Sequence, residues 1–244
     1  MRDMWSYIHA RTVVRAMTRL RGPVSDHTVG LQRFLRRVIE GRESFSILQI
    51  GAYDGVSNDS VHELLRTCEN IRALLLEPQP GPYATLQARW RDIPRVTTLR
   101  CALGDTPGER PLYVIADAHR HRHPFPDQVA SFLRSQVEFA YSRYVWRPSP
   151  TAITSVTVPV VDWGTLVQKH GPFDLVAIDA EGYDAEILKQ IDSHTPPAVI
   201  LYEHRCLSSN VQQECEHLLT GRGYSVRRVN SADTVASRVG SPGF

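Results

Sequence analysis

The residues FSILQIGAYDG, from Phe45 to Gly55, decide the fold that this sequence predicts. The run before Gly51 is short, apolar and rich in isoleucine, which is typical of a buried parallel strand. Asp54 and a second glycine follow within four positions. We therefore expect a strand of a parallel sheet that ends in a ligand-binding turn.

The composition excludes several classes of protein. The 244 residues include 28 basic and 26 acidic side chains, so no overall field favours nucleic acid or an anionic membrane surface. The cysteines form no CxxC pair and no zinc-type spacing, which predicts free thiols: Cys68, Cys101, Cys206 and Cys215. No run approaches the roughly 20 apolar residues of a membrane span, and no signal-peptide pattern opens the chain. We expect a soluble, cytoplasmic protein without stable membrane insertion and without a nucleic-acid partner.

Two helices are predicted before the first strand. Residues 5–20 have apolar side chains at helical spacing with arginines between them, and residues 27–39 repeat the helical pattern. A basic amphipathic helix can lie on a membrane, but such helices more commonly cover a domain edge or pair with another subunit. We expect residues 1–44 to form a helical cap, and a homodimer through these helices is a hypothesis.

From residue 45 onward, strand and helix patterns alternate, as in a parallel sheet covered on both faces. We expect one α/β domain over residues 45–244. Its expected strands are 47–50, 71–77, 96–103, 173–179 and 198–203, and its expected helices are 60–66, 82–90, 185–191 and 211–219. The tail after Gly223 alternates between apolar and polar residues and predicts a closing pair of strands.

One segment interrupts the alternation. Residues 111–116 and 153–160 read as strands, and residues 117–150 between them are rich in histidine, arginine, proline and aromatic residues. A long insertion in a compact domain is more often a functional lid than slack chain. We expect a helix at 127–144 within it. The alternating His/Arg run at 119–123 predicts a solvated basic loop rather than a metal site, and its contact with a substrate stays open.

Acidic residues end successive strands of the expected sheet. Ligands of open α/β sheets lie beyond the carboxyl ends of the strands. The glycines at 51 and 55 allow close approach of a ligand, and Asp54 disfavours a pyrophosphate. Glu77 ends the next strand, where a carboxylate can accept both hydroxyls of a ribose. The segment from Cys101 to Asp105 is apolar enough to flank an adenine, so the sequence predicts one nucleoside pocket.

The run VAIDAEGYDAEIL, residues 176–188, forms a second constellation. Asp179 ends an apolar strand, where a carboxylate must be solvated, paired or bound, and Glu181 lies in the following turn. The next strand ends in Glu203 and His204. The imidazole is a candidate proton acceptor or, equally, a hydrogen-bonded structural residue. These four groups are also hard ligands for a divalent ion such as Mg²⁺, which is a minority hypothesis.

The motifs LQIGAYDG, LLLEPQP, CALGD, VPVVDWGTLV and IDAEGYDAEIL, in this order, resemble the FkbM family of S-adenosylmethionine-dependent methyltransferases. The resemblance covers residues 45–225. It implies a class I methyltransferase fold, which is a Rossmann-like, seven-stranded and mostly parallel sheet with the last strand antiparallel. Tyr53 replaces a common asparagine and Ala180 a common valine, but neither change removes a charged group.

The resemblance also implies roles for individual residues. The 51–55 turn would meet the methionine part of the cofactor, Glu77 the ribose and the Ala102–Asp105 segment the adenine. The residues expected to bind S-adenosylmethionine are Gly51, Ala52, Tyr53, Asp54, Gly55, Glu77, Pro78, Ala102, Leu103 and Asp179. The residues expected to be catalytic are His204, Asp179, Glu181 and Glu203. The implied acceptor is a hydroxyl of a small natural product, sugar or lipid-linked glycan, and methylation of nitrogen stays open.

The sequence disfavours two other classes of protein. An NAD-dependent oxidoreductase of the short-chain type needs a dense GxGxxG turn and normally a Tyr-x-x-x-Lys pair, and this sequence has neither. A non-catalytic, nucleoside-binding scaffold with a relic fold should have lost acids at Asp54, Glu77 or Asp179, and all three positions carry acids. We therefore predict an S-adenosylmethionine-dependent O-methyltransferase and keep these classes as alternatives.

Overall fold

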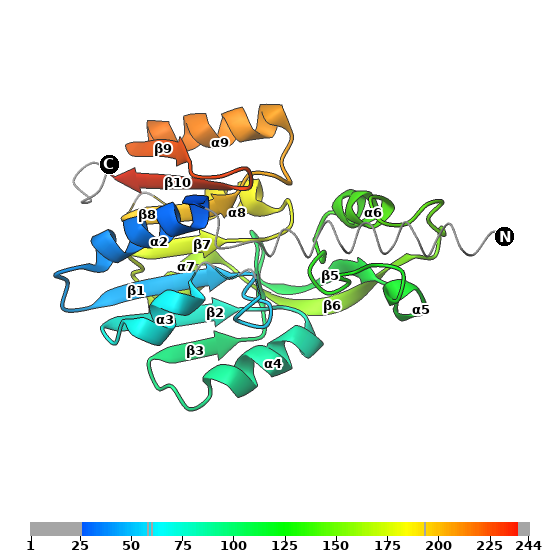
Figure 1. The fold of residues 1–244 in the computed structure, drawn as a ribbon, viewed down its shortest axis with the longest axis horizontal. Coiled ribbons are helices and arrows are strands. Elements are labelled where there is room, and N and C mark those ends of the chain that lie inside the picture. The colour runs from blue at the N-terminus through cyan, green and yellow to red at the C-terminus, as the bar shows by residue number, and fades with distance from the viewer. Residues whose placement is uncertain (1–25, 58, 60, 193, 239–244) are drawn as a thin grey trace.

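The computed structural model describes residues 26–57, 59, 61–192 and 194–238. Its main element is a seven-stranded sheet in the order β3-β2-β1-β7-β8-β10-β9 (Figure 1). In chain order these strands are β1 (Phe45–Ile50), β2 (Ile71–Leu76), β3 (Val96–Leu99), β7 (Leu175–Ile178), β8 (Val199–Glu203), β9 (Tyr224–Arg228) and β10 (Asp233–Arg238). The predicted helix at 5–20 lies outside the described residues, so pairing of subunits through it stays a prediction.

Strand direction confirms the predicted fold class. β1 pairs in parallel with both β2 and β7, and β7 pairs in parallel with β8. The last strand, β10, is antiparallel to both of its neighbours, β8 and β9. Strand order runs outward in opposite directions from β1, so the β1/β7 boundary is the switch point at which open α/β sheets bind ligands.

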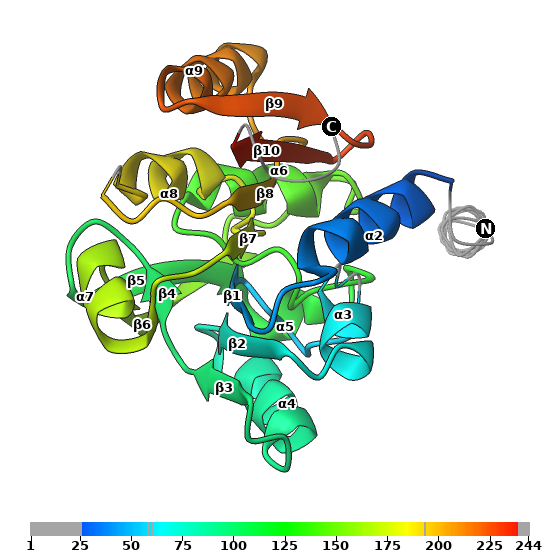
Figure 2. The same cartoon turned by 90° about the vertical axis from the view of Figure 1, so that its left-hand side faces the viewer.

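Apolar residues of the central strands face two cores. Phe45 and Ile47 of β1 belong to one buried cluster, and Leu48 and Ile50 belong to the other, because successive side chains of a strand point to opposite faces. The first cluster includes side chains of three helices, α2 (Asp26–Ile39), α3 (His62–Thr67) and α4 (Pro80–Trp90). The second includes those of α7 (Trp163–His170), α8 (Asp184–Gln190) and α9 (Ser209–Gly221). Helices therefore cover both faces of the sheet (Figure 2).

Helix α7 was not among the predicted helices. Its first turn is capped by Asp162, whose carboxylate accepts hydrogen bonds from the Thr165 backbone N–H at 2.9 Å and from the Thr165 hydroxyl at 2.7 Å. An aspartate at the N-cap satisfies backbone donors that the helix itself leaves free. The sequence Asp-Trp-Gly-Thr contained this signal.

The predicted strand at 96–103 is wrong as a single element. β3 ends at Leu99, opposite Leu76, the last residue of β2. Beyond that point β2 provides no ladder partner, and the chain joins a second, three-stranded sheet in the order β4-β6-β5. Its strands are β4 (Ala102–Leu103), β5 (Gly108–Ile115) and β6 (Ile153–Val161). This sheet lies beyond the carboxyl ends of the main parallel strands, at the right of Figure 1.

The insertion, residues 117–150, contains two short helices instead of one long helix. They are α5 (Asp117–Arg120) and α6 (Arg134–Ser142), so the predicted helix at 127–144 begins too early. Ser131 forms an antiparallel bridge with Tyr113, exchanging backbone hydrogen bonds of 3.1 and 2.9 Å. A residue whose backbone is used in a bridge cannot extend a helix, so α6 starts after it. Within the described part of the chain, no helix is long and apolar enough to cross a membrane.

Candidate active site

A cavity of about 370 Å³ lies beyond the carboxyl ends of β1, β2, β7 and β8. Ten residues that the sequence assigned to a site line its wall: Gly51, Ala52, Tyr53, Glu77, Pro78, Ala102, Leu103, Asp179, Glu181 and Glu203. Four others do not: Asp54, Gly55, Asp105 and His204. The sheet therefore brings the acidic ends of β2, β7 and β8 to one cavity, as the strand-end argument expects.

Gly51 makes the junction between β1 and β7. Its φ is +80°, and a Cβ at this position would lie 1.9 Å from the backbone oxygen of Asp179. No side chain fits there without a backbone shift. Gly55 is required for packing, because a Cβ added at this position would lie 2.7 Å from both Leu86 Cδ1 and Trp90 Nε1. It lets helix α4 pack against the turn, which is a structural role rather than contact with a ligand.

Asp54 stabilises its own turn. One carboxylate oxygen accepts hydrogen bonds from the backbone N–H groups of Val56 and Ser57, at 2.9 and 2.7 Å, and the other accepts one from the Ser57 hydroxyl at 2.7 Å. The side chain is thus committed to local structure outside the cavity wall. The expected contact of Asp54 with the cofactor is not part of this arrangement.

Glu77 is held in place by the backbone on both sides of it. Its Oε2 accepts a hydrogen bond from the Tyr53 N–H at 2.9 Å, and its Oε1 accepts one from the Gln79 N–H at 2.8 Å. Tyr53 has a φ of +49°, which aims that amide at the carboxylate. Burial raises the pKa of Glu77 to about 7, since removal from water disfavours the charged form. The carboxylate is fixed and still lines the cavity.

The β7 and β8 ends form a crowded acidic edge. Asp179 is open to the cavity, and its carboxylate has no hydrogen bond to any described residue. Desolvation within the cavity, and then the carboxylates of Glu203 and Asp233, raise the pKa of Asp179. Burial and its acidic neighbours, Asp179 first, likewise raise the pKa of Glu181. Among the described residues that line the cavity, the one cation is Arg205, whose Nη2 lies 2.6 Å from Glu203 Oε1.

His204 faces away from the cavity. The side chain is buried, and its Nδ1 lies 2.9 Å from the hydroxyl oxygen of Thr234 on β10. Burial lowers the pKa of His204. This arrangement fits the structural interpretation of the histidine, and a proton acceptor for a ligand must come from another residue.

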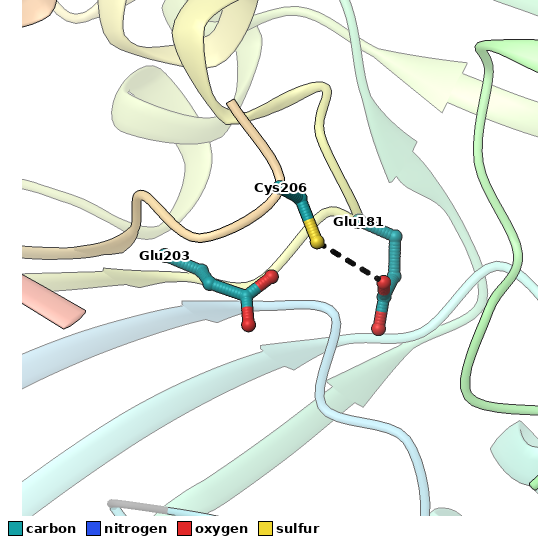
Figure 3. A group of neighbouring side chains, drawn as sticks. All are labelled: Glu181, Glu203 and Cys206. Atoms are coloured by element: carbon teal, nitrogen blue, oxygen red, sulfur yellow. Dashed lines mark hydrogen bonds between the residues drawn. The ribbon is translucent and has the colours of Figure 1, made fainter. Parts of the chain in front are cut away.

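The four residues proposed for Mg²⁺ do not gather around one point. Among the described residues, the group whose ligand atoms all lie within 4.8 Å of one another is Glu181, Glu203 and Cys206. Cys206 Sγ donates a hydrogen bond to Glu181 Oε2 at 3.7 Å, as drawn in Figure 3. Asp179 and His204 are not members of this group, and a thiol takes the place of the imidazole.

Sequence reasoning missed a polar pair on the floor of the cavity. Gln49, in the apolar strand β1, donates from Nε2 to Asp59 Oδ1 at 3.1 Å. Gln49 Oε1 and Asp59 Oδ2 are buried and accept no hydrogen bond from a described residue. A lone amide near the end of an apolar strand was the available signal. These two oxygens can accept hydrogen bonds from a donor-rich or cationic ligand.

The insertion supplies another wall of the cavity. Its residues on the cavity are Asp127, Gln128, Ala130, Ser131 and Phe132. The Phe132 ring meets the Tyr183 ring edge to face, at 5.1 Å between centroids. The guanidinium of Arg110 lies 4.4 Å above Phe132 and donates to the Tyr183 hydroxyl at 2.9 Å. This contact ties the insertion to the turn that carries Glu181.

The 119–123 run is not entirely a solvated loop. His123 is buried, and its ring lies 4.7 Å from the Tyr144 ring and 6.2 Å from the Tyr141 ring between centroids. Arg120 forms an ion pair of 2.5 Å with Asp127. Part of the run therefore supports the fold of the insertion, and that part of the prediction is wrong.

Three solved structures show what this chain is similar to. One is methyltransferase FkbM from Methylobacillus flagellatus KT, with 14% identity and a TM-score of 0.48, covering 96% of this chain and 60% of that chain. Another is precorrin-6y C5,15-methyltransferase from Geobacter metallireducens GS-15, with 12% identity and a TM-score of 0.45, covering 87% and 88%. The third is Aeropyrum pernix fibrillarin in complex with natively bound S-adenosyl-L-methionine, with 11% identity and a TM-score of 0.41, covering 85% and 76%.

The sequence itself matches a family model. No curated protein matches the chain. The model of the methyltransferase FkbM domain matches residues 49–226, which is well over half of the chain. The matched region includes the turn after β1, the ends of β2, β7 and β8, and the whole insertion.

Proposed function

The chain belongs to the FkbM methyltransferase domain family, and from that premise we propose that it transfers a methyl group from S-adenosylmethionine to a hydroxyl oxygen. The resemblance of its motifs to this family is thereby confirmed. The acceptor that we propose is a small natural product, a sugar or a lipid-linked glycan. The methyltransferase domain would extend over residues 45–244, with residues 1–44 as a cap and the insertion shaping acceptor choice.

The position of Glu77 carries the proposal. It directly follows β2, next to β1 at the switch point of the sheet, and backbone amides orient both of its oxygens. Each carboxylate oxygen has lone pairs beyond the one used by an amide, so the group can still accept the two hydroxyls of a ribose. Ala102 and Leu103, on the same wall, would flank the adenine.

The acids at the ends of β7 and β8 suit the cationic, methionine end of the cofactor. A sulfonium and an ammonium are both cations, and Asp179, Glu181, Glu203 and Asp59 give the cavity an excess of negative charge. This charge would favour S-adenosylmethionine over the neutral product, S-adenosylhomocysteine, and so would assist release of the product.

The proposed reaction is an in-line displacement. The carbon–sulfur bond of the methyl group breaks as a carbon–oxygen bond forms, and the electron pair of the broken bond stays on sulfur. The acceptor hydroxyl loses its proton to Asp179, because this carboxylate is open to the cavity and engaged by no described donor. Positioning of the two reactants contributes about 7 to 11 kcal/mol in well-oriented systems, and a base adds roughly 10²- to 10⁴-fold.

Calorimetry tests the cofactor without knowledge of the acceptor. We expect S-adenosylhomocysteine and S-adenosylmethionine to bind, and NAD not to bind. Binding of NAD alone would support the oxidoreductase alternative instead. Transfer of a labelled methyl group into a panel of hydroxylated small molecules, sugars and glycans then tests catalysis. Cofactor binding with no transfer to any acceptor, in the panel or in an extract, would favour the non-catalytic alternative.

A further inference from the structure

Two carboxylate oxygens and one thiol sulfur lie close together near the end of β8. Glu181 comes from the turn between β7 and α8, while Glu203 and Cys206 come from the end of β8 and the turn after it. One atom of each residue lies within 4.8 Å of the others. Figure 3 shows the two carboxylates and the thiol directed toward a common space. Residues distant in sequence are thus brought together by the fold.

Glu203 provides an independent indication of a ligand. Only 5% of the residue is exposed. Oε1 accepts the hydrogen bond from Arg205 Nη2, but Oε2 is buried and accepts no hydrogen bond from a described residue. A buried carboxylate oxygen without a partner is unfavourable unless a donor or a cation meets it. The free oxygen belongs to the carboxylate that faces Glu181 and Cys206 (Figure 3).

The spacing of the atoms suits a small cation. Zinc–sulfur bonds measure about 2.3 Å and zinc–oxygen bonds about 2.0–2.2 Å, so neighbouring sulfur and oxygen ligands of a tetrahedral site lie roughly 3.5 Å apart. Cys206 Sγ lies 3.7 Å from Glu181 Oε2. A shift of a few tenths of an ångström would bring this pair to bonding geometry.

We propose that Glu181, Glu203 and Cys206 bind a divalent transition-metal ion of the Zn²⁺ type. A thiolate ligand favours such borderline ions, whereas Mg²⁺ prefers oxygen ligands alone. Binding replaces the thiol proton by the metal and releases that proton to solvent. Three protein ligands leave a fourth position open. If the proposed function holds, an acceptor hydroxyl in the cavity can occupy that position and lose its proton more readily.

Cobalt is the direct probe of this site. Protein stripped with EDTA is titrated with Co²⁺, and we expect a near-ultraviolet thiolate-to-cobalt absorption band that saturates at one equivalent. An excess of Zn²⁺ should remove the band. Cys206→Ser should abolish it, and Glu203→Gln should weaken Co²⁺ binding at least tenfold. Cys68→Ser is the matched control, since Cys68 is also a free, half-buried cysteine and lies at the end of α3; its band should equal that of the unchanged protein.

Each outcome decides the proposal. No band, a band that persists in Cys206→Ser, or saturation only above millimolar Co²⁺ overturns it. Circular dichroism of each variant shows whether a lost band reflects lost folding. If Cys206→Ser does not fold, Glu203→Gln and alkylation of Cys206 in the Cys68→Ser protein, whose other two cysteines are buried, give the same test. Binding of S-adenosylhomocysteine to the stripped protein is measured in parallel. Normal binding of that ligand without a cobalt band leaves the methyltransferase proposal intact and rejects only the metal.

Discussion

The two acidic edges of the cavity are built in opposite ways. At the β2 edge, a backbone amide meets each oxygen of Glu77. At the β7/β8 edge, Asp179, Glu181 and Glu203 lie close together, and Arg205 is the only cation on the part of the wall that the structure describes. Two carboxylates about 5 Å apart repel each other by roughly 3 kcal/mol at an effective dielectric of about 20. Both oxygens of Glu77 therefore have a hydrogen-bond donor without a ligand. The acids of the β7/β8 edge, in contrast, need a cationic ligand to balance their charge.

Substitution of Asp179, on the β7/β8 edge, should have the largest effect on activity. Asp179→Asn keeps the shape of the side chain but cannot take a proton. We expect methyl transfer to the best acceptor to fall by about 10²- to 10⁴-fold. Affinity for S-adenosylhomocysteine should fall much less, because Glu181, Glu203 and Asp59 stay on the cavity wall to meet its ammonium group. Rates and calorimetry on the same preparation measure both. Asp105→Asn, outside the cavity, should change neither, and nearly normal turnover of Asp179→Asn would remove this residue from the chemistry.

Substitution of Gly51, where the turn after β1 lies against the end of β7, should have the next largest effect. Gly51→Ala places a Cβ against the Asp179 carbonyl in a left-handed conformation. We expect the free energy of unfolding to fall by about 2 to 5 kcal/mol, from backbone strain and overpacking together. Gly41 has a similar φ of +75° but nothing within 4 Å of its Cβ position, so Gly41→Ala should lose only about 1 to 2 kcal/mol. Equal losses in urea denaturation would contradict the close approach of β1 and β7.

Truncation at the β2 edge should act on binding. Glu77→Ala removes charge-assisted hydrogen bonds worth about 1.5 to 3 kcal/mol, which corresponds to about 10- to 150-fold weaker binding of S-adenosylhomocysteine. Calorimetry gives the value directly. The control is Asp105→Ala, because Asp105 was predicted near adenine but is not among the described residues on the cavity wall and forms an exposed ion pair with Arg110. Unchanged affinity of Glu77→Ala would refute the ribose contact.

The same carboxylate predicts a pH dependence. The pKa of Glu77 is raised from 4.5 to about 7 by burial, whereas a bound ribose favours the ionised form. Affinity for S-adenosylhomocysteine should therefore fall as pH drops below about 7, by at most about tenfold per pH unit. Folding has the opposite sign: the contribution of this group to stability is complete below about 4.5 and is lost as pH rises through about 7. Glu77→Gln should weaken the pH dependence of both ligand affinity and folding stability. If affinity still depends on pH in the Glu77→Gln variant, another group causes the effect.

The smallest effect on catalysis should come from His204. His204→Ala removes a buried hydrogen bond with Thr234, so stability should fall by about 1 to 3 kcal/mol. Turnover per folded molecule should stay within about twofold, because the ring is not on the cavity wall. A drop of turnover by 10²-fold or more in folded protein would return the role of base to this histidine.

Sequence reasoning located the acids because the sheet repeats a simple rule. Glu77 and Asp179 each end an apolar run, and parallel strands deliver such ends to one edge. The turn glycines were equally visible, although only Gly51 borders the cavity. These features depend on residues close together in the chain, so periodicity and turn chemistry were enough to predict them.

The remaining features depend on partners that are distant in sequence. The break between β3 and β4 follows from where β2 ends, and the late start of α6 follows from the bridge between Ser131 and Tyr113. The direction of the His204 ring is set by Thr234, thirty residues later. The approach of Cys206 to Glu181 likewise requires the folded turn after β8. No local pattern contains this information.

The two-residue strand β4 has a consequence for exchanging parts between relatives. Ala102 and Leu103 pair with Val160 and Val161 of β6, and β6 also forms a full antiparallel ladder with β5. The wall proposed to hold adenine is therefore hydrogen-bonded to the base of the insertion. A graft that replaces only residues 117–150 leaves the old strands to support a foreign loop. Residues 102–161 form the smallest cassette that carries its own scaffolding, and a chimera designed to change acceptor preference should move them together.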